Sequence, residues 1–293
     1  MKYYYLSFLP LGHSDLVGFY VTRFADNIAH WPYSSYKLSN SGNTVGPIEY
    51  PVLTGLIVWL TALVTPKDGL PRFNYFFLNS ALLGALFVAA VYVVMRSVEK
   101  GLSKLLILSP AVILSLYLNW DLWAVIPMLI SIQSFEHSKY RRSAILLGIA
   151  ISAKFFPIVL LFPISLIFVK SRREKELFKY ILVTSITWLL INLPVIVFNR
   201  EGWLYFYKFS ATRMLGDGSL FNIFAKFGIM ESTPIWAYYV LNVAAFVLLG
   251  RYLWKSNLPI GLNSSAFLAV IRSEEHTSEL QSRQYLVCRL LLE

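Results

Sequence analysis

AILLGIAISAKFFPIVLLFPISLIFV, residues 144–169, is a 26-residue apolar run with a single charged side chain, Lys154. An uncharged or nearly uncharged run longer than about 18 residues is typical of a membrane-spanning helix. A lysine at the bilayer centre costs about 2.5 to 3.5 kcal/mol, so a lysine in such a run is usually paired or functional. Pro157 follows three residues later and disfavours helix at Phe156. The run therefore predicts membrane helix that is interrupted near Lys154.

Other apolar runs surround this one, and short polar breaks separate them. The chain has 293 residues, of which 57% are hydrophobic and only 14% charged, with a mean hydropathy of +0.58. Soluble domains carry about 25% charged residues. The composition excludes a water-soluble enzyme and predicts an all-α, polytopic transmembrane helical bundle. Its further runs are residues 52–64, 73–95, 105–118, 122–135, 177–197, 235–254 and a truncated start near 266.

The net charge of +10 is concentrated in the breaks and does not form one basic stripe. This distribution excludes nucleic acid as a partner and is typical of cytoplasmic loops under the positive-inside rule. We therefore expect the breaks to share the cytoplasmic side, with an even number of crossings between any two of them. The basic breaks are residues 96–104, 139–142, 170–179 and 251–255.

Turns on the far, exoplasmic side follow from this arrangement. One turn is expected at Asn119–Trp120–Asp121 and another near Lys154, and the segment 199–233 is expected to be an exoplasmic loop. Residues 52–64 reach only about 20 Å as a helix, too short to cross the membrane alone. A re-entrant or an interfacial helix fits this length, and the sequence leaves the choice open.

Residues 12–49 form a polar stretch that is too long for an idle connection and is expected to be a functional exoplasmic loop. Within it, apolar residues recur near helical spacing between Asp15 and His30, which predicts an amphipathic helix on the membrane surface. These residues are Leu16, Phe19, Tyr20, Phe24 and Ile28.

Both ends of the chain differ in character from the rest. The first apolar piece, residues 3–11, is about half a spanning helix. The last residues, RSEEHTSELQSRQYLVCRLLLE at 272–293, resemble a translated sequencing adapter, with a native polar tail as the alternative. We expect residues 1–271 to be a single membrane domain truncated at both ends, and 272–293 not to be native.

Common catalytic and metal motifs are absent from the sequence. No P-loop, HExxH, CxxC or GxSxG pattern occurs, and the only cysteine is Cys288. We therefore expect no cofactor and no bound metal.

The remaining candidates are polar residues that the predicted topology gathers on the exoplasmic side. Asp15 lies close to the membrane surface, where a carboxylate serves as general base for a sugar hydroxyl or is an ordinary surface aspartate. Asp26 presents the same choice on weaker grounds. Possible substrate-binding residues are Asp26, Glu49, Tyr50, Asn119 and Asp121.

Two cations are candidates for phosphate binding. Lys154 either meets an anionic lipid phosphate or snorkels from a helix end, and no acidic residue near it in sequence offers an alternative partner. Arg213 follows the aromatic residues 203–207, which suit sugar and phosphate binding but are also ordinary interfacial anchors. Asp121 either orients a ligand hydroxyl or caps the helix that begins at Leu122.

Several strings, in this order, resemble the polytopic GT-C glycosyltransferases, particularly family 87 and relatives of the GPI mannosyltransferase I catalytic subunit. The most specific strings are EYPVLTG at 49–55, SP at 109–110 with NWDL at 119–122, and AKFFP at 153–157. Weaker matches are HSDL at 13–16 with Phe19-Tyr20, PY at 32–33, and Arg213 with GSL at 218–220.

The resemblance implies an inverting transfer of a hexose, usually mannose, from a polyprenyl-phosphate sugar to a lipid or glycan acceptor on the exoplasmic face. It places Asp15 as the catalytic base, with Lys154 and Arg213 binding the donor phosphate. The expected location is the bacterial or archaeal cell membrane, in a multi-pass protein whose partners are membrane lipid, donor and acceptor. A flippase or transporter of lipid-linked sugars is the alternative.

Overall fold

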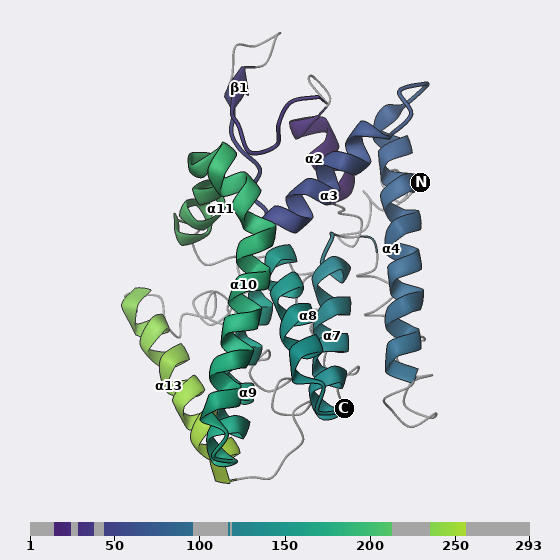
Figure 1. Cartoon of the computed structure of the whole chain (residues 1–293). Coiled ribbons are helices and arrows are strands. Elements are labelled where there is room, and N and C mark those ends of the chain that lie inside the picture. Colours follow the sequence, from purple (N-terminus) through teal and green to yellow (C-terminus); the bar gives the residue numbers. More distant parts are fainter. Residues whose placement is uncertain are drawn as a thin grey trace, which may run out of the picture.

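The computed structural model describes residues 15–24, 29–37, 44–95, 117, 119–212 and 235–255. These residues are helical apart from loops and one very short hairpin, which confirms the all-α prediction (Figure 1). The elements are α2 (Asp15–Arg23), β1 (Tyr36–Lys37), β2 (Thr44–Val45), α3 (Val52–Leu63), α4 (Pro71–Met95), α7 (Leu122–Glu136), α8 (Tyr140–Ala153), the 3-10 helix η1 (Phe156–Leu160), α9 (Leu161–Lys170), α10 (Glu174–Phe198), α11 (Arg200–Thr212) and α13 (Ile235–Lys255).

Helices α7, α8 and α10 form the centre of the bundle. α7 and α8 are antiparallel, joined by a tight turn in which Ser138 has a positive φ of 58°. α8 and α10 are parallel, because Tyr180 pairs with Ser143 while Asn192, further along α10, pairs with Ser152. The chain must therefore return between α8 and α10, and η1 with α9 provides this return. The predicted reversal near Lys154 is confirmed.

The close contact between α8 and α10 depends on Gly148. A Cβ at this position would lie 2.7 Å from the carbonyl oxygen of Thr184 and 2.7 Å from the Cβ of Thr187. Both neighbours belong to rigid parts of α10, so they cannot yield without moving the helix. Gly148 thus sets the distance between the two central helices.

We expect Gly148→Ala to lower the stability of the bundle by about 1 to 3 kcal/mol through overpacking. Thermal unfolding of the purified protein in detergent measures the effect. Gly18→Ala in α2 is the matched control, because Gly18 is exposed and a Cβ there meets nothing within 4 Å. Helix propensity predicts that the control is neutral or slightly stabilising. Equal destabilisation by both changes would contradict the assigned role of Gly148.

Two of the basic breaks, residues 139–142 and 170–179, lie together at one end of the bundle. Arg173, in the α9–α10 turn, donates a hydrogen bond from Nη1 to the hydroxyl of Tyr140, at the start of α8, over 3.0 Å. The last turns of α13 have other neighbours, because Leu253 packs against Val159 of η1 and a Cβ at Gly250 would lie 3.0 Å from the ring of Phe162 at the start of α9. The basic break at 96–104 lies outside the described residues. The predicted clustering of charge is confirmed for residues 139–142 and 170–179, and for residues 251–255 it stays a prediction.

Two described helices, α4 and α10, are long and apolar enough to cross a membrane. Each has 25 residues, which corresponds to about 37 Å. Two of the three central helices are shorter, at about 22 Å for the 15 residues of α7 and about 21 Å for the 14 residues of α8. α10 therefore extends beyond the two helices that share the centre of the bundle with it.

Helices α2, α3 and α11 cover the other end of the bundle (Figure 1). α3 lies obliquely across the end of α8, where the hydroxyl of Thr54 donates to the carbonyl of Ala153 over 2.6 Å. α3 therefore packs over the helix ends, and the choice between a re-entrant and an interfacial helix for residues 52–64 stays open.

The helix predicted for residues 15–30 differs from the observed one. α2 ends at Arg23, and residues 29–37 form a turn and strand β1, in which Tyr36 pairs with Val45 of β2. The apolar face of α2 packs on the bundle, including α4, and is buried there. The apolar spacing in this segment therefore predicted a helix correctly. The apolar face of α2, however, is covered by protein and not by the membrane surface.

Candidate functional site

Lys154 lies where α8 ends. Its backbone is extended, with φ −146° and ψ 148°, and its N–H still donates to the carbonyl of Ala150 over 3.0 Å. The α-helix does not continue because Pro157 has no N–H to donate to the carbonyl of Ala153, which accepts a hydrogen bond from Thr54 instead. The break is thus at Lys154, whereas Phe156, where the sequence predicted it, begins η1. The break directs the lysine side chain out of the helical ladder at the covered end of the bundle.

The Lys154 ammonium forms an ion pair with Asp121 at the start of α7. The Nζ and Oδ1 atoms are 2.8 Å apart, and the side chains are 17% and 2% exposed, respectively. The expectation that Lys154 lacks an acidic partner was therefore wrong. The two residues are 33 positions apart, so only the packing of α7 against α8 brings them together.

The alternative of Asp121 as a helix cap is not observed, since its side chain makes no capping hydrogen bond to α7. The neighbours of Asp121 hold its backbone instead. Its N–H donates to Oδ1 of Asn119 over 3.0 Å, and the indole N–H of Trp120 donates to Oδ1 of Asn79 in α4 over 2.8 Å. Asn119, Trp120 and Asp121 are all buried. The carboxylate is thus fixed in place before any ligand arrives.

Tyr50 completes the surroundings of the ammonium. The Lys154 Nζ atom lies 5.0 Å from the centre of the Tyr50 ring, within the range of a cation–π interaction. The Tyr50 carbonyl accepts a hydrogen bond from the hydroxyl of Tyr33 over 3.2 Å. Two of the predicted substrate-binding residues, Tyr50 and Asp121, therefore lie beside Lys154.

Asp15 begins the helix that packs above this cluster. Phe19, one turn further along α2, contacts the rings of Tyr50 and Trp120 edge-on, with centroids 5.5 Å away in both cases. Because residues four apart share a helix face, Asp15 belongs to the face of α2 that is turned toward the cluster. Asp15 is partly exposed. The structure thus brings the predicted base into the same region as Lys154.

Glu49 pairs with a cation other than Lys154. It forms an ion pair with Arg23 at the end of α2, and Arg23 also donates to the carbonyl of Gly46 over 2.6 Å. The carbonyl of Arg23 accepts a hydrogen bond from the hydroxyl of Tyr36 over 2.9 Å. These contacts connect the end of α2 to residues 46–49, which precede α3. Glu49 therefore has a structural partner, and its predicted role in substrate binding remains a prediction.

Aromatic residues of α11 line the far side of the break. Tyr207 meets Phe155 edge-on at 5.9 Å and packs against Trp203, whose indole N–H donates to Oδ1 of Asn192 over 2.9 Å. Burial raises the pKa of Tyr207 to about 12, so its phenol stays protonated at neutral pH. Arg213 and Asp26 lie outside the described residues.

Sequence reasoning missed three polar residues that support the site. Asn79 and Asn192 each lie within a long apolar helix, a position where polar side chains are costly and usually serve a purpose. Their positions in the runs 73–95 and 177–197 were the available signal. Thr54, which joins α3 to the end of α8, lies in the apolar run 52–64 but gave no such signal, because a hydroxyl can bond the backbone of its own helix at little cost.

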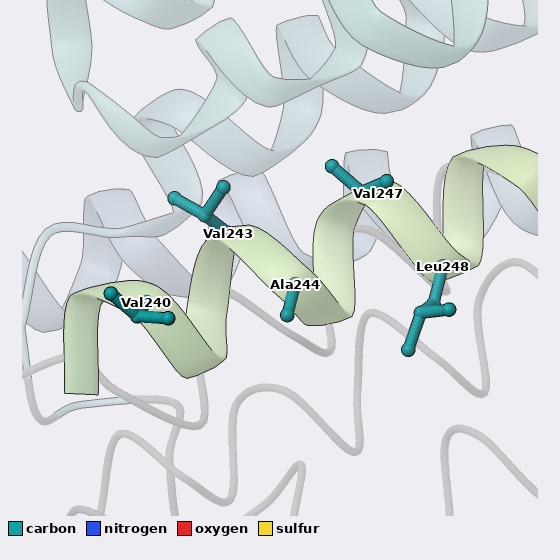
Figure 2. A pocket seen from close by; sticks show the side chains of 5 residues that line it. All are labelled: Val240, Val243, Ala244, Val247 and Leu248. Atoms are coloured by element: carbon teal, nitrogen blue, oxygen red, sulfur yellow. The ribbon is translucent and has the colours of Figure 1, made fainter. Parts of the chain in front are cut away.

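The described residues offer no second site for a sugar or a phosphate among their metal-ligand types or in the groove on α13. Among the described residues, no group of three or more His, Cys, Asp or Glu side chains is placed to hold a metal ion. An apolar groove of about 550 Å³ lies on α13 and is lined by Val240, Val243, Ala244, Val247 and Leu248 (Figure 2). These side chains offer no polar group to a sugar or a phosphate.

Comparison with known proteins gives one match. The model of glycosyltransferase family 87 matches residues 49–273, about three quarters of the chain. This range contains Tyr50, Asp121 and Lys154 and begins after Asp15. No curated protein and no solved structure matches the chain.

Proposed function

The chain belongs to glycosyltransferase family 87, a family of membrane glycosyltransferases, and we propose that it transfers a hexose from a polyprenyl-phosphate sugar to a lipid or glycan acceptor. Mannose is the proposed sugar, and the reaction takes place with inversion on the exoplasmic face of a bacterial or archaeal cell membrane. The Asp121–Lys154 pair is the observation that carries this proposal.

The depth of the pair suits a phosphate carried by a lipid. Trp120, beside Asp121, bonds to Asn79, which lies eight residues or about 12 Å into α4. Ser152, just before Lys154, bonds to Asn192, which lies six residues or about 9 Å before the end of α10. The ammonium thus lies about 10 Å inside the ends of the long helices. A phosphate on a membrane-embedded polyprenyl chain can be held at that depth.

The proposed reaction is a single displacement at the anomeric carbon. The acceptor hydroxyl oxygen attacks this carbon from the side opposite the phosphate, and Asp15 takes the hydroxyl proton. The bond between the anomeric carbon and the phosphate oxygen breaks, and the electron pair leaves with polyprenyl phosphate. Lys154 and Arg213 stabilise the negative charge on the leaving phosphate. The charge is neutralised by these side chains, so the proposal requires no metal.

Asp121 has a defined part in this proposal. A lysine side chain is flexible, and a buried carboxylate at 2.8 Å keeps the ammonium oriented while the donor is absent. Asp121 is therefore a positioning residue for Lys154, and it does not touch the reacting atoms.

The flippase or transporter alternative has less support than the transferase. The family matched over residues 49–273 consists of glycosyltransferases. A transporter also has no need for a carboxylate such as Asp15 near a phosphate-binding lysine.

Transfer of label tests the proposed function. Membranes containing the full-length protein are incubated with radiolabelled polyprenyl-phosphate mannose and candidate lipid or glycan acceptors. We expect label to move into an acceptor only when the protein is present. Movement of intact labelled donor across the membrane without transfer would favour the transporter.

The proposed orientation is tested by labelling with an impermeant thiol reagent in a chain that carries Cys288→Ser. Lys67→Cys lies in the exposed α3–α4 loop at the end that contains Lys154, and Ser138→Cys lies in the exposed α7–α8 turn at the basic end. We expect the first to react in intact cells and the second only after permeabilisation. The opposite pattern would place the Asp121–Lys154 pair near the cytoplasmic face.

A further inference from the structure

A polar cavity lies at the turn between α7 and α8, at the end of the bundle opposite Lys154. It has a volume of about 410 Å³ and is lined by Gln133, Ser134, His137, Lys139 and Arg142. We call it the basic recess. Its volume lies within the range of about 300 to 1,000 Å³ that is typical of small-ligand sites.

The charges of the basic recess favour an anion. Lys139 and Arg142 line it, and no carboxylate does. Neither cation takes part in the ion pairs found among the described residues. Those pairs join Arg23 to Glu49, Lys154 to Asp121 and Arg173 to Glu176. Arg142 offers a planar fork of N–H donors that matches phosphate oxygens, and Lys139 adds a point charge.

The polar walls of the basic recess are held in a defined shape. The backbone N–H of Lys139 donates to the carbonyl of Ser134 over 2.8 Å. Nδ1 of His137 lies 2.7 Å from the carbonyl oxygen of Gln133, a hydrogen bond that fixes the imidazole against α7. Hydrogen bonds within the α7–α8 turn therefore fix its backbone, and the side chains of Lys139 and Arg142 extend from it.

The basic recess lies at the boundary between polar and apolar helix surface. Ile145, three residues after Arg142 and hence on the same face of α8, is 37% exposed. On α7, Ile130 lies three residues before Gln133 and hence on the same helix face. A ligand at this level meets cations on one side and apolar side chains on the other. A phospholipid has both parts, whereas a free phosphate has only the first.

We propose that the basic recess binds the headgroup phosphate of an anionic phospholipid. Lys139 and Arg142 hold the phosphate, Gln133 and Ser134 contact the headgroup, and an acyl chain runs along Ile145. Basic cavities between helix ends at a membrane surface recognise anionic lipids in this way. The inference does not depend on the proposed function, because it concerns the other end of the bundle.

Native mass spectrometry of the purified full-length protein with phosphatidylglycerol tests this site. A cation near a membrane surface strengthens binding of an anionic lipid about fivefold, so Lys139→Gln with Arg142→Gln should weaken retention about 30-fold. The matched control is Lys175→Gln with Lys179→Gln, which removes two exposed cations from α10 at the same end. We expect less than a threefold change for the control.

Equal losses in the two double variants would show nonspecific charge attraction and overturn the proposal, as would native retention by the recess variant. Thermal unfolding checks that both variants keep the native fold. Because Lys139 and Arg142 are exposed, we expect unchanged melting temperatures. Competition with glycerol 3-phosphate separates lipid from soluble phosphate. Displacement of phosphatidylglycerol at equal concentration would assign the basic recess to a soluble phosphate and overturn the lipid assignment.

Discussion

Asp15→Asn is expected to lower turnover by about 10² to 10⁴, the usual contribution of a general base, while expression and melting temperature stay unchanged. The amide keeps the size of the side chain and its place in the first turn of α2, but it cannot accept the hydroxyl proton of the acceptor. Initial rates of sugar transfer at saturating donor and acceptor measure the effect. A loss in turnover with little change in KM for the donor is the expected signature.

Asp68→Asn is the matched control for Asp15→Asn. Asp68 is an exposed carboxylate in the loop between α3 and α4, at the same end of the bundle. Its replacement changes the local charge equally and should leave turnover within about twofold of the native protein. Near-native transfer by Asp15→Asn would move the role of base to Asp26 or Glu49.

Lys154→Met is expected to abolish use of the donor and also to destabilise the protein. The methionine cannot bind a phosphate, and its introduction leaves the carboxylate of Asp121, only 2% exposed, without the lysine. Removing one partner of a buried ion pair costs on the order of 3 kcal/mol. Transfer rates and thermal unfolding in detergent measure the two losses separately.

The double variant Lys154→Met with Asp121→Asn distinguishes these two effects. Neutralising Asp121 removes the buried charge, so the double variant should recover most of the lost stability and none of the transfer activity. Asp121→Asn alone should keep part of the activity, with a raised KM for the donor, because Lys154 remains but is less well oriented. Native activity in the double variant would show that the pair serves structure alone.

The break in the run 144–169 could be predicted from sequence because its causes are local. Proline lacks the N–H that would continue an α-helix, and a lysine in apolar surroundings must find a polar environment. The basic ends of the helices followed from charge alone. The positions of proline, lysine and other charged residues can be read without knowing which helices pack together. For this reason the predicted reversal near Lys154 and the predicted shared basic end of residues 139–142 and 170–179 were confirmed.

The ion pair itself could not be predicted in this way. Asp121 and Lys154 belong to different helices, and their contact depends on the register of α7 against α8, which small residues such as Ser131 and Ser143 set by a 2.8 Å hydrogen bond. Helical periodicity also cannot tell whether an apolar face meets lipid or protein. For that reason α2 was expected on the membrane surface, whereas Phe19 is buried against Tyr50 and Trp120.

The unequal helix lengths have a consequence for the surrounding bilayer. α7 and α8, at about 22 and 21 Å, are shorter than a hydrocarbon core of about 30 Å, whereas α4 and α10 exceed it. Where the surface of the bundle brings α7 or α8 to lipid, we expect local thinning of the bilayer to relieve this hydrophobic mismatch. Headgroup water then approaches the level of Lys154 from the side. A lipid phosphate reaching the ammonium by lateral diffusion would keep its hydration, and thicker membranes would raise the energetic barrier to its entry.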